Sequence, residues 1–392
     1  MSRELLIAGG GIGGLAAAVA ARRARWEARL FEQADRFSEV GAGIQLGPNT
    51  SRILREWDLL QGPLADQVAT PPRLRVRDGV DGAELGLLEL GASCEQRYGA
   101  PYLTVHRADL QAALLEAARL AGTRMHSGCR ISSVEPQADG VAVRTPAAEL
   151  VNGDALVAAD GVWSKLRQEV AGGDAPRSSG HLAYRGIVRQ HDLPERLRSA
   201  EVTVWLAPRM HLVSYPVRGG DWLNVVCVVE GTQPGDPHDW DHAASQAQLD
   251  AALGPVCAEV RERVASMPDW RLWVLHARPP VASPDQMARG RLALLGDAAH
   301  PMRPYLAQGA GMAIEDAREL QRVLAMVSDD IADVPTALRR YALNRWERVA
   351  RVQERSLRNG TIFHASGPLR LARNAGLRTL GARLLDQPWL YR

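Results

Sequence analysis

The sequence predicts an α/β fold, α+β overall, in which a parallel-sheet domain carries an inserted β-sheet and the chain ends in helices. Near the amino terminus, short apolar runs bounded by glycine alternate with stretches whose apolar residues recur at helical spacing. This pattern is expected of buried parallel strands joined by helices. Between residues 182 and 229, strand-like stretches separated by Gly/Pro turns indicate an antiparallel sheet. The α/β pattern returns at 291–295, and long helical stretches follow.

One βαβ unit is predicted at the amino terminus. Residues 5–8 are apolar and precede a run of glycines, residues 15–25 have helical spacing, and residues 29–32 form a second strand. Further strands are predicted at 154–159, 182–188, 202–206, 211–217, 222–229 and 291–295, and further helices at 109–120, 313–326 and 335–357.

The composition excludes several classes of function. The chain has 392 residues and a net charge of +2, so no global field attracts nucleic acid or an anionic membrane. Its four cysteines lack CxxC spacing, which argues against a disulfide framework and against a metal site. The amino terminus enters a strand directly, which leaves no room for a signal peptide, and no apolar run approaches the length of a membrane span. We expect a cytoplasmic protein with no nucleic-acid partner and no stable membrane association.

A glycine fingerprint follows the first predicted strand. Gly9, Gly11 and Gly14 occupy the GxGxxG positions, where glycine permits a tight turn and the close approach of a pyrophosphate to the start of a helix. Glu32 ends the second strand about 20 residues later, where a carboxylate can accept hydrogen bonds from ribose hydroxyls. The glycines and Glu32 predict dinucleotide binding. An acidic residue at position 32, with no second fingerprint in the chain, favours FAD as the resident cofactor.

Three further motifs point to the same cofactor. Asp160-Gly161 and Gly296-Asp297 each follow an apolar run, and Gly309-Ala310-Gly311 begins a predicted helix. Together with the amino-terminal glycines, they resemble the FAD-contacting motifs of single-component flavoprotein aromatic hydroxylases. An Asp-Gly turn alone is common after a strand, so the order of all the motifs carries the resemblance.

The resemblance implies a role for each of these motifs. Asp297 would bind the ribityl chain of FAD, and Arg107 would lie near its pyrophosphate, for which a guanidinium supplies two matched donors. The helix that begins at 309–311 would place its positive amino terminus near the pyrimidine end of the flavin, where it stabilises the anionic reduced form. A solvated surface arginine is the alternative for Arg107.

The chain is more narrowly similar to the 3-hydroxybenzoate 6-hydroxylases, with features of 6-hydroxynicotinate 3-monooxygenase and, more loosely, of salicylate hydroxylase. The similar segments are 41–49, 184–185, 210–220, 305–310 and 362–365. The resemblance implies substrate contacts by Gln45, Arg185 and Tyr305. Arg303-Pro304 departs from the hydroxybenzoate pattern, which has a glutamine immediately before the tyrosine. Either Arg303 or Arg185 can therefore pair with a substrate carboxylate, and either can instead form a structural ion pair.

The resemblance implies catalytic roles for His211 and Tyr215. Side chains two apart on a strand share a face, so His211, Val213 and Tyr215 point the same way. Electrophilic hydroxylation needs an electron-rich phenolate, and a histidine near neutral pKa can withdraw the phenolic proton. Tyr215 can hydrogen-bond the phenolate or the carboxylate. The alternative is a packed histidine in the sheet beside an interfacial tyrosine.

The resemblance implies a cytoplasmic FAD-dependent monooxygenase that hydroxylates a phenolic aromatic acid with O2 through a flavin C4a-hydroperoxide. NADH or NADPH would act as a transient co-substrate, because the chain has no second dinucleotide fold. A homodimer is the family expectation. Three alternatives remain: hydroxylation of salicylate or 6-hydroxynicotinate, hydroxylation of a quinone precursor, and a FAD-binding sensor without oxygenase chemistry.

The motifs also suggest a domain division. A discontinuous Rossmann-like FAD-binding domain is expected at 1–75, 106–178 and 277–335. A β-sheet substrate domain is expected at 76–105 and 179–276, and a helical carboxyl-terminal segment at 336–392. Residues 231–242 are polar and are predicted to form a mobile surface loop. The His238–His242 pair in that loop lacks a third ligand or a helical scaffold, so no metal site is expected.

Overall fold

The computed structural model describes residues 3–37, 41–147, 149–173, 175–232, 235–236 and 241–392. Contacts divide the chain into two compact units. Unit 1 consists of Met1–Glu39, Leu110–Arg177 and Ala277–Arg355, and unit 2 of Val40–Asp109, Ser178–His276 and Ser356–Arg392. Both units are discontinuous in sequence. The domain boundaries drawn from the sequence stay a prediction.

Unit 1 is built on a mostly parallel sheet. Its strand order is β19 (Ala288–Arg289), β20 (Leu292–Leu294), β12 (Ala155–Ala158), β1 (Glu4–Ala8), β2 (Glu27–Phe31) and β8 (Arg124–His126). Strand β1 lies parallel to both β2 and β12, and β12 lies parallel to β20. The carboxyl ends of β1, β12 and β20, which precede the predicted glycine and aspartate motifs, therefore meet at one edge of the sheet.

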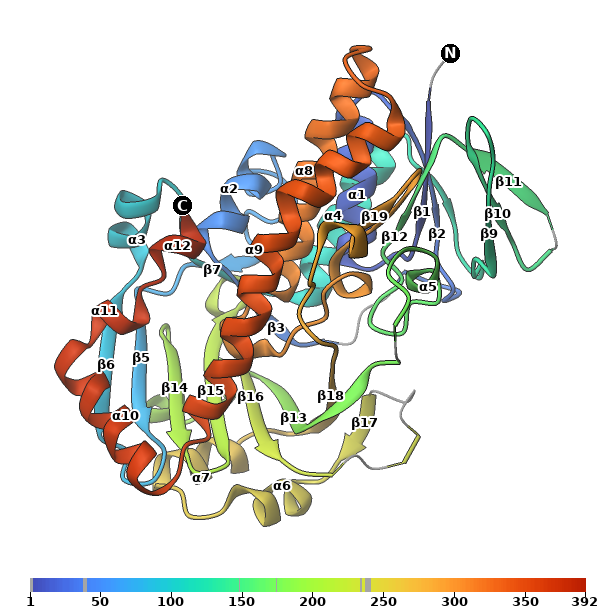
Figure 1. Ribbon diagram of the computed structural model, residues 1–392. Helices are drawn as coiled ribbons and strands as arrows, with labels where there is room; N and C mark the ends of the chain where they lie inside the picture. The colour runs from blue at the N-terminus through green and yellow to red at the C-terminus, as the bar shows by residue number, and fades with distance from the viewer. Residues whose placement is uncertain (1–2, 38–40, 148, 174, 233–234, 237–240) are drawn as a thin grey trace. The chain divides into compact units, whose positions relative to one another are not determined.

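Helices flank this sheet. Helix α1 (Ile12–Arg23) packs against α8 (Gly309–Ser328), as Figure 1 shows. The alanines of α1 are buried, and their small side chains permit this close helix–helix approach. The remaining elements of the unit are α4 (Arg107–Leu120), β9 (Ser133–Pro136), β10 (Val141–Arg144), β11 (Leu150–Gly153), α5 (Arg167–Val170) and the first part of α9 (Val334–Phe363).

Unit 2 is built on a larger, mostly antiparallel sheet. Its order is β17 (Asp241–Ala244), β18 (Trp270–Ala277), β13 (Arg177–Arg189), β16 (Trp222–Glu230), β15 (Met210–Val217), β14 (Val202–Ala207), β5 (Arg73–Asp78) and β6 (Glu84–Glu89). A second sheet has the order β3 (Gly43–Leu46), β7 (Leu103–His106), β4 (Val68–Ala69). The helices of the unit are α2 (Pro48–Glu56), α3 (Gly91–Tyr98), α6 (Gln246–Leu253), α7 (Ala258–Ala265), α10 (Gly367–Leu380), α11 (Ala382–Leu385) and α12 (Pro388–Tyr391).

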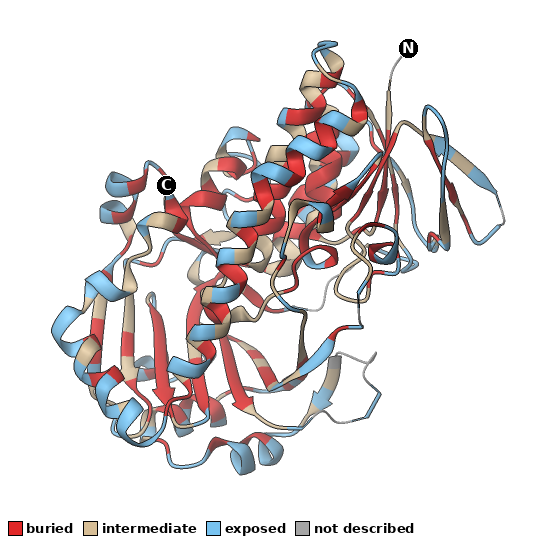
Figure 2. Ribbon diagram, in the orientation of Figure 1, coloured by how far each residue is buried: buried red, intermediate tan, exposed pale blue. Residues whose placement is uncertain are grey.

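The two faces of the larger sheet pack against different helices. Met210 and Leu212 of β15 join a core with Leu249 of α6 and Val260 of α7. On the opposite face, Val213 packs in a cluster that includes Leu377 of α10. Figure 2 shows β14 to β16 buried along most of their length, whereas α10 and α11 carry many exposed residues. The face shared by His211, Val213 and Tyr215, predicted from the alternation of the strand, is thereby confirmed.

The predicted fold class is confirmed, and so is each predicted helix and strand, with ends that differ by a few residues. The largest differences are at β13, which begins five residues before its predicted start, and at α9, which ends six residues beyond its predicted end. The predicted loop at 231–242 includes residues 233–234 and 237–240, which lie outside the described residues. His238 is one of them. Among the residues that the structure describes, no helix combines the length and apolarity needed to cross a bilayer.

Candidate active site

The glycine turn of unit 1 is sterically required by the chain's own packing. Gly9 has φ +103°, and a Cβ there would lie 2.4 Å from the carbonyl oxygen of Ala159. A Cβ on Gly14 would lie 1.9 Å from the carbonyl oxygen of Gly9. Gly11 is the extended N-cap of α1, so no side chain covers the amino end of the helix. Such an end, with its backbone N–H groups, fits a phosphate.

Glu32 stands beside this turn. Its Oε2 accepts a hydrogen bond from the Gly10 N–H at 2.5 Å, and its Oε1 accepts one from the Ala34 N–H at 2.8 Å. Gln111 Nε2 donates to the Gly10 carbonyl at 3.1 Å. Each carboxylate oxygen keeps a further lone pair, so Glu32 can also accept a ribose hydroxyl. Sequence reasoning placed Glu32 correctly at the end of the second strand but missed Gln111.

The two aspartate motifs follow neighbouring strands and are tied together. Arg167 Nη1 donates to the carbonyl oxygens of Ala298, at 2.9 Å, and Ala299, at 2.6 Å. Burial, with the nearby charge of Arg278, lowers the pKa of Arg167 to about 10, so the group stays charged at neutral pH. Arg167 therefore links the loop after β12 to the loop after β20.

The loop residues themselves leave room for a bound group. No atom lies within 4 Å of a Cβ built on Gly161, which has φ +79°, or on Gly309. Asp297 is exposed although its neighbours in the short helix η5 (Gly296–Ala298) are buried. Desolvation raises the pKa of Asp160, and its Oδ1 has no hydrogen-bond partner among the described residues. Buried oxygens of this kind are normally satisfied, so an acceptor here fits the hydroxyls of a polar cofactor.

A buried ionic network fixes the loop after β20. Asp316 of α8 is 0% exposed, and its Oδ2 accepts from the Gly296 N–H at 3.1 Å and contacts His300 Nε2 at 2.6 Å. Arg345 Nε donates to Asp316 Oδ1 at 2.7 Å, and Arg345 Nη1 donates to Glu315 Oε2 at 2.8 Å. Burial opposes ionisation of Asp316, but His300 and Arg345 outweigh it and lower the pKa of the carboxyl. Glu315 and Asp316 are both buried, so they hold this loop from the interior of the unit.

In unit 2, β3 brings Gln45 to the sheet face that carries Tyr215. The Gly43 N–H donates to Asn224 Oδ1 at 2.6 Å, and a Cβ on Gly43 would lie 2.6 Å from the Tyr215 ring. Tyr102 donates its hydroxyl hydrogen to Gln45 Oε1 at 2.6 Å. Desolvation raises the pKa of Tyr215, so its phenol is protonated and can donate a hydrogen bond. Neither Gly43 nor Tyr102 was identified from the sequence.

Arg185 lies on the same face and is held by an aromatic ring. Its guanidinium carbon is 3.9 Å from the centroid of Trp273, and that of Arg107 is 5.9 Å from the same centroid. Burial lowers the pKa of Arg185 to about 10, and Arg107 adds to the lowering. The buried Arg185 Nε has no hydrogen-bond partner, and Arg185 has no carboxylate partner, among the described residues. A half-buried cation with a buried N–H group of this kind favours an anionic ligand.

His211 is buried at the other end of the same face. Its Nδ1 lies 2.9 Å from His364 Nε2, and its ring packs edge-on against Phe363 at 5.3 Å between centroids. Burial, with the nearby rings of His364 and His181, lowers the pKa of His211 well below its usual range. Four residues of strand separate His211 from Tyr215, about 13 Å between Cα atoms.

Tyr305 and Arg303 lie in unit 1, whereas Arg107 lies beside the Trp273 ring on which Arg185 stacks. Tyr305 is buried in the short helix η6 (Pro304–Leu306) of unit 1, and Arg303 immediately precedes that helix. Arg107 begins α4 in unit 2. The roles drawn for these residues from the resemblance stay predictions, and so does the choice between Arg303 and Arg185 for a substrate carboxylate.

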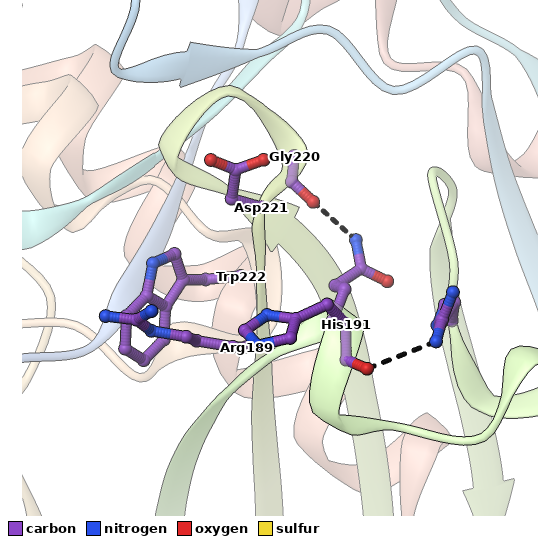
Figure 3. A pocket seen from close by; sticks show the side chains of 7 residues that line it. Arg189, His191, Gly220, Asp221 and Trp222 are labelled. Carbon is purple, nitrogen blue, oxygen red and sulfur yellow. Dashed lines mark hydrogen bonds between the residues drawn. The ribbon is translucent and has the colours of Figure 1, made fainter.

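A separate open hollow of about 510 Å³ occurs in unit 2. Figure 3 shows Arg189, His191 and Trp222 around it, with the Arg189 guanidinium 5.1 Å from the Trp222 centroid. Gln190 Nε2 donates to the Gly220 carbonyl at 2.7 Å and ties one side of the hollow to the other. No predicted site residue lines it.

We expect Gly43→Ala to disturb the substrate face without affecting the glycine turn of unit 1. The added methyl group would overlap the Tyr215 ring, and overpacking of this kind costs about 1–3 kcal/mol. The kcat/KM for an aromatic substrate should fall at least tenfold while the FAD content stays that of the unchanged protein. Gly376→Ala in α10 is the matched control, because its nearest atom would be 3.9 Å away. Equal activity of the two variants would contradict the packing role of Gly43.

Comparisons with known proteins agree with the motifs. The family model described as "FAD binding domain" matches residues 3–356. The chain is 37% identical to a 3-hydroxybenzoate 6-hydroxylase of Polaromonas naphthalenivorans, covering 94% of this chain and 90% of that protein. It is 38% identical to the 3-amino-4-hydroxybenzoate 2-monooxygenase PtnB3 of Streptomyces platensis, covering 99% of this chain and 95% of that protein. The structure of Klebsiella pneumoniae HpxO with FAD and uric acid superposes with a TM-score of 0.85 at 26% identity, covering 98% of this chain and 94% of that chain.

Proposed function

Since the chain belongs to the FAD-binding flavin monooxygenases and is a FAD-dependent aromatic hydroxylase, we propose that its substrate is a phenolic benzoate such as 3-hydroxybenzoate. NAD(P)H is the reductant typical of this family. The proposal concerns the identity of the substrate and the roles of the residues in unit 2. A 3-amino-4-hydroxybenzoate is the second candidate, because a 3-amino-4-hydroxybenzoate 2-monooxygenase is 38% identical to this chain over nearly its full length.

The observation that supports a carboxylate-bearing substrate is the half-buried Arg185, whose Nε is buried. Its guanidinium stacks on Trp273 and has no carboxylate partner among the described residues. Because a guanidinium matches a carboxylate with two parallel donors, Arg185 would hold the carboxylate end of the ligand. Tyr215 and Gln45 lie beside it and would orient the ring through hydrogen bonds.

The residues of unit 1 fit the cofactor of the family. The amino end of α1, Glu32, Asp160, Asp297 and the start of α8 would hold FAD. When bound, FAD supplies the activation of oxygen that ring hydroxylation requires. The glycine positions, the buried acceptor at Asp160 and the open space beside Gly161 and Gly309 support this assignment.

His211 would take the phenolic proton. Its lowered pKa keeps the imidazole neutral at pH 7, with a lone pair available on one ring nitrogen. Loss of the phenolic proton makes the ring more electron-rich and therefore more reactive toward an electrophilic oxygen. Arg185 at the carboxylate end and His211 at the hydroxyl end would fix the orientation of the substrate ring on unit 2.

The substrate proposal is tested by NADH and NADPH oxidation with a panel of aromatic acids. The panel contains 3-hydroxybenzoate, 3-amino-4-hydroxybenzoate, salicylate, 4-hydroxybenzoate, gentisate and 6-hydroxynicotinate, and hydrogen peroxide is measured alongside the product. We expect 3-hydroxybenzoate to accelerate oxidation and to give hydroxylated product with little peroxide. Stimulation by 3-amino-4-hydroxybenzoate alone would favour the second candidate. Hydroxylation of a phenol without a carboxylate, at an equal kcat/KM, would contradict the proposed role of Arg185.

A further inference from the structure

A continuous chain of side chains runs from buried His211 to the surface of unit 2. His211, which is 3% exposed, has its Nδ1 2.9 Å from His364 Nε2. The other ring nitrogen of His364, Nδ1, lies 3.5 Å from Glu230 Oε1. The Glu230 side chain is 33% exposed and reaches solvent. Both ring nitrogens of His364 therefore face a titratable partner, one buried and one at the surface.

The backbone and two arginines hold this chain in place. The Arg209 N–H donates to the His364 carbonyl oxygen at 3.0 Å, which ties the residue after α9 to the start of β15. Arg373 Nη1 donates to the Phe363 carbonyl oxygen at 2.9 Å. Arg209 Nε also donates to Glu230 Oε2 at 2.9 Å, which leaves Oε1 directed at His364. Contacts with other residues of unit 2 therefore fix the order of His211, His364 and Glu230.

The carboxylate decides which nitrogen of each histidine carries hydrogen. The negative charge of an ionised Glu230 lies 3.5 Å from His364 Nδ1, at ion-pair distance without hydrogen-bond geometry, and favours the tautomer with hydrogen on that nitrogen. His364 Nε2 then holds a lone pair and accepts from His211 Nδ1–H. His211 Nε2 is consequently the nitrogen with a lone pair, which is the form a proton acceptor needs. The negative charge of this series lies on Glu230, at the surface, and it favours movement of a proton outward from His211.

The surroundings disfavour a proton that stays on His211. His181 lies close to the chain, with its ring centroid 4.9 Å from that of His364, and its cationic form would repel a charged His211. Arg209 adds a positive charge next to Glu230. Together with burial, these neighbours make His211 a site through which a proton passes. An exit for the proton is therefore needed if His211 serves as the base.

We propose that His364 and Glu230 conduct the phenolic proton from His211 to solvent. The inference rests on the proposed function of His211. In the transfer, the substrate O–H bond breaks and a new N–H bond forms at His211 Nε2. His211 Nδ1–H passes its proton to His364 Nε2, and His364 Nδ1–H passes its proton to Glu230 Oε1, from which water removes it. No electrons are gained or lost, and one proton is released for each substrate ionised.

The FAD-loaded enzyme is mixed with 3-hydroxybenzoate at pH 7 in weakly buffered solution. A pH indicator follows proton release, and ultraviolet absorbance follows phenolate formation. We expect His364→Gln and Glu230→Gln to slow both signals at least tenfold while the Kd for the ligand changes less than threefold. Glu230→Asp should recover part of the rate, a recovery that a merely structural role would not produce. Glu230 lies at the surface, so its variants keep the test valid even if His364→Gln fails to fold.

The controls separate the two proposals. His191→Gln and Glu95→Gln remove an exposed histidine and an exposed, arginine-paired carboxylate elsewhere in unit 2, and should leave both signals unchanged. If His211→Gln abolishes phenolate formation but the His364 and Glu230 variants match the unchanged enzyme, the relay is wrong and the proposed base remains. If His211→Gln has no effect, or if the unchanged enzyme binds 3-hydroxybenzoate without releasing a proton, both proposals are wrong.

Discussion

Arg185→Met is expected to lower kcat/KM for a phenolic benzoate by about 30- to 1,000-fold, mostly through KM. The half-buried guanidinium stacks on Trp273 with its Nε buried, and removal of the cation that pairs with a desolvated carboxylate costs about 2–4 kcal/mol. Arg185→Lys keeps the charge but not the paired donors, so an intermediate loss is expected. Steady-state kinetics with 3-hydroxybenzoate, and with a phenol that lacks the carboxylate, measure the effect.

Arg189→Met is the matched control for this prediction. Arg189 lies on the same strand and also stacks on a tryptophan, Trp222, but it is exposed. Its replacement should change kcat/KM less than threefold. The carboxylate role of Arg185 is wrong if the two variants behave alike, or if the carboxylate-free phenol loses as much activity as the acid in Arg185→Met. In that case Arg303 becomes the better candidate for the carboxylate.

Arg345→Met is expected to lower the free energy of unfolding by about 3–5 kcal/mol. Removal of this arginine leaves the fully buried Asp316 without its arginine partner, whereas Glu315 keeps Arg348. An uncompensated buried charge is strongly destabilising. Asp316 also accepts from the Gly296 N–H, so the loop that carries Asp297 should become less ordered and the FAD content should fall. Urea denaturation and the flavin absorbance of the purified protein measure these two effects.

An exposed ion pair on α8 provides the comparison. Arg322 pairs with Glu319 one turn away on the surface, where a salt bridge contributes less than about 1 kcal/mol. Arg322→Met should therefore change stability little. If Arg345→Met also lowers the free energy of unfolding by less than about 1 kcal/mol, the buried network is not needed to hold the loop after β20.

The sequence by itself determined the features that depend on local backbone geometry. The turn at Gly9 and Gly14 needs glycine because a Cβ would meet neighbouring carbonyl oxygens, and this requirement is visible in the spacing of the glycines. The position of Glu32 at the end of a strand and the shared face of His211 and Tyr215 follow from the same short-range regularities. These features could be predicted because each is set by residues a few positions apart or by a known spacing.

Only the tertiary structure decided the partners of these residues. Trp273 stacks on Arg185 from another strand, Gly43 admits the Tyr215 ring, and His364 meets His211 across 153 positions of sequence. Asp316 is buried between His300 and Arg345, which come from other parts of the chain. Helical periodicity gives the direction of a side chain relative to its own helix, but burial depends on which distant elements pack there. Local sterics therefore fixed the cofactor motifs, whereas long-range packing determined the charge environment of the residues proposed to bind and ionise the substrate.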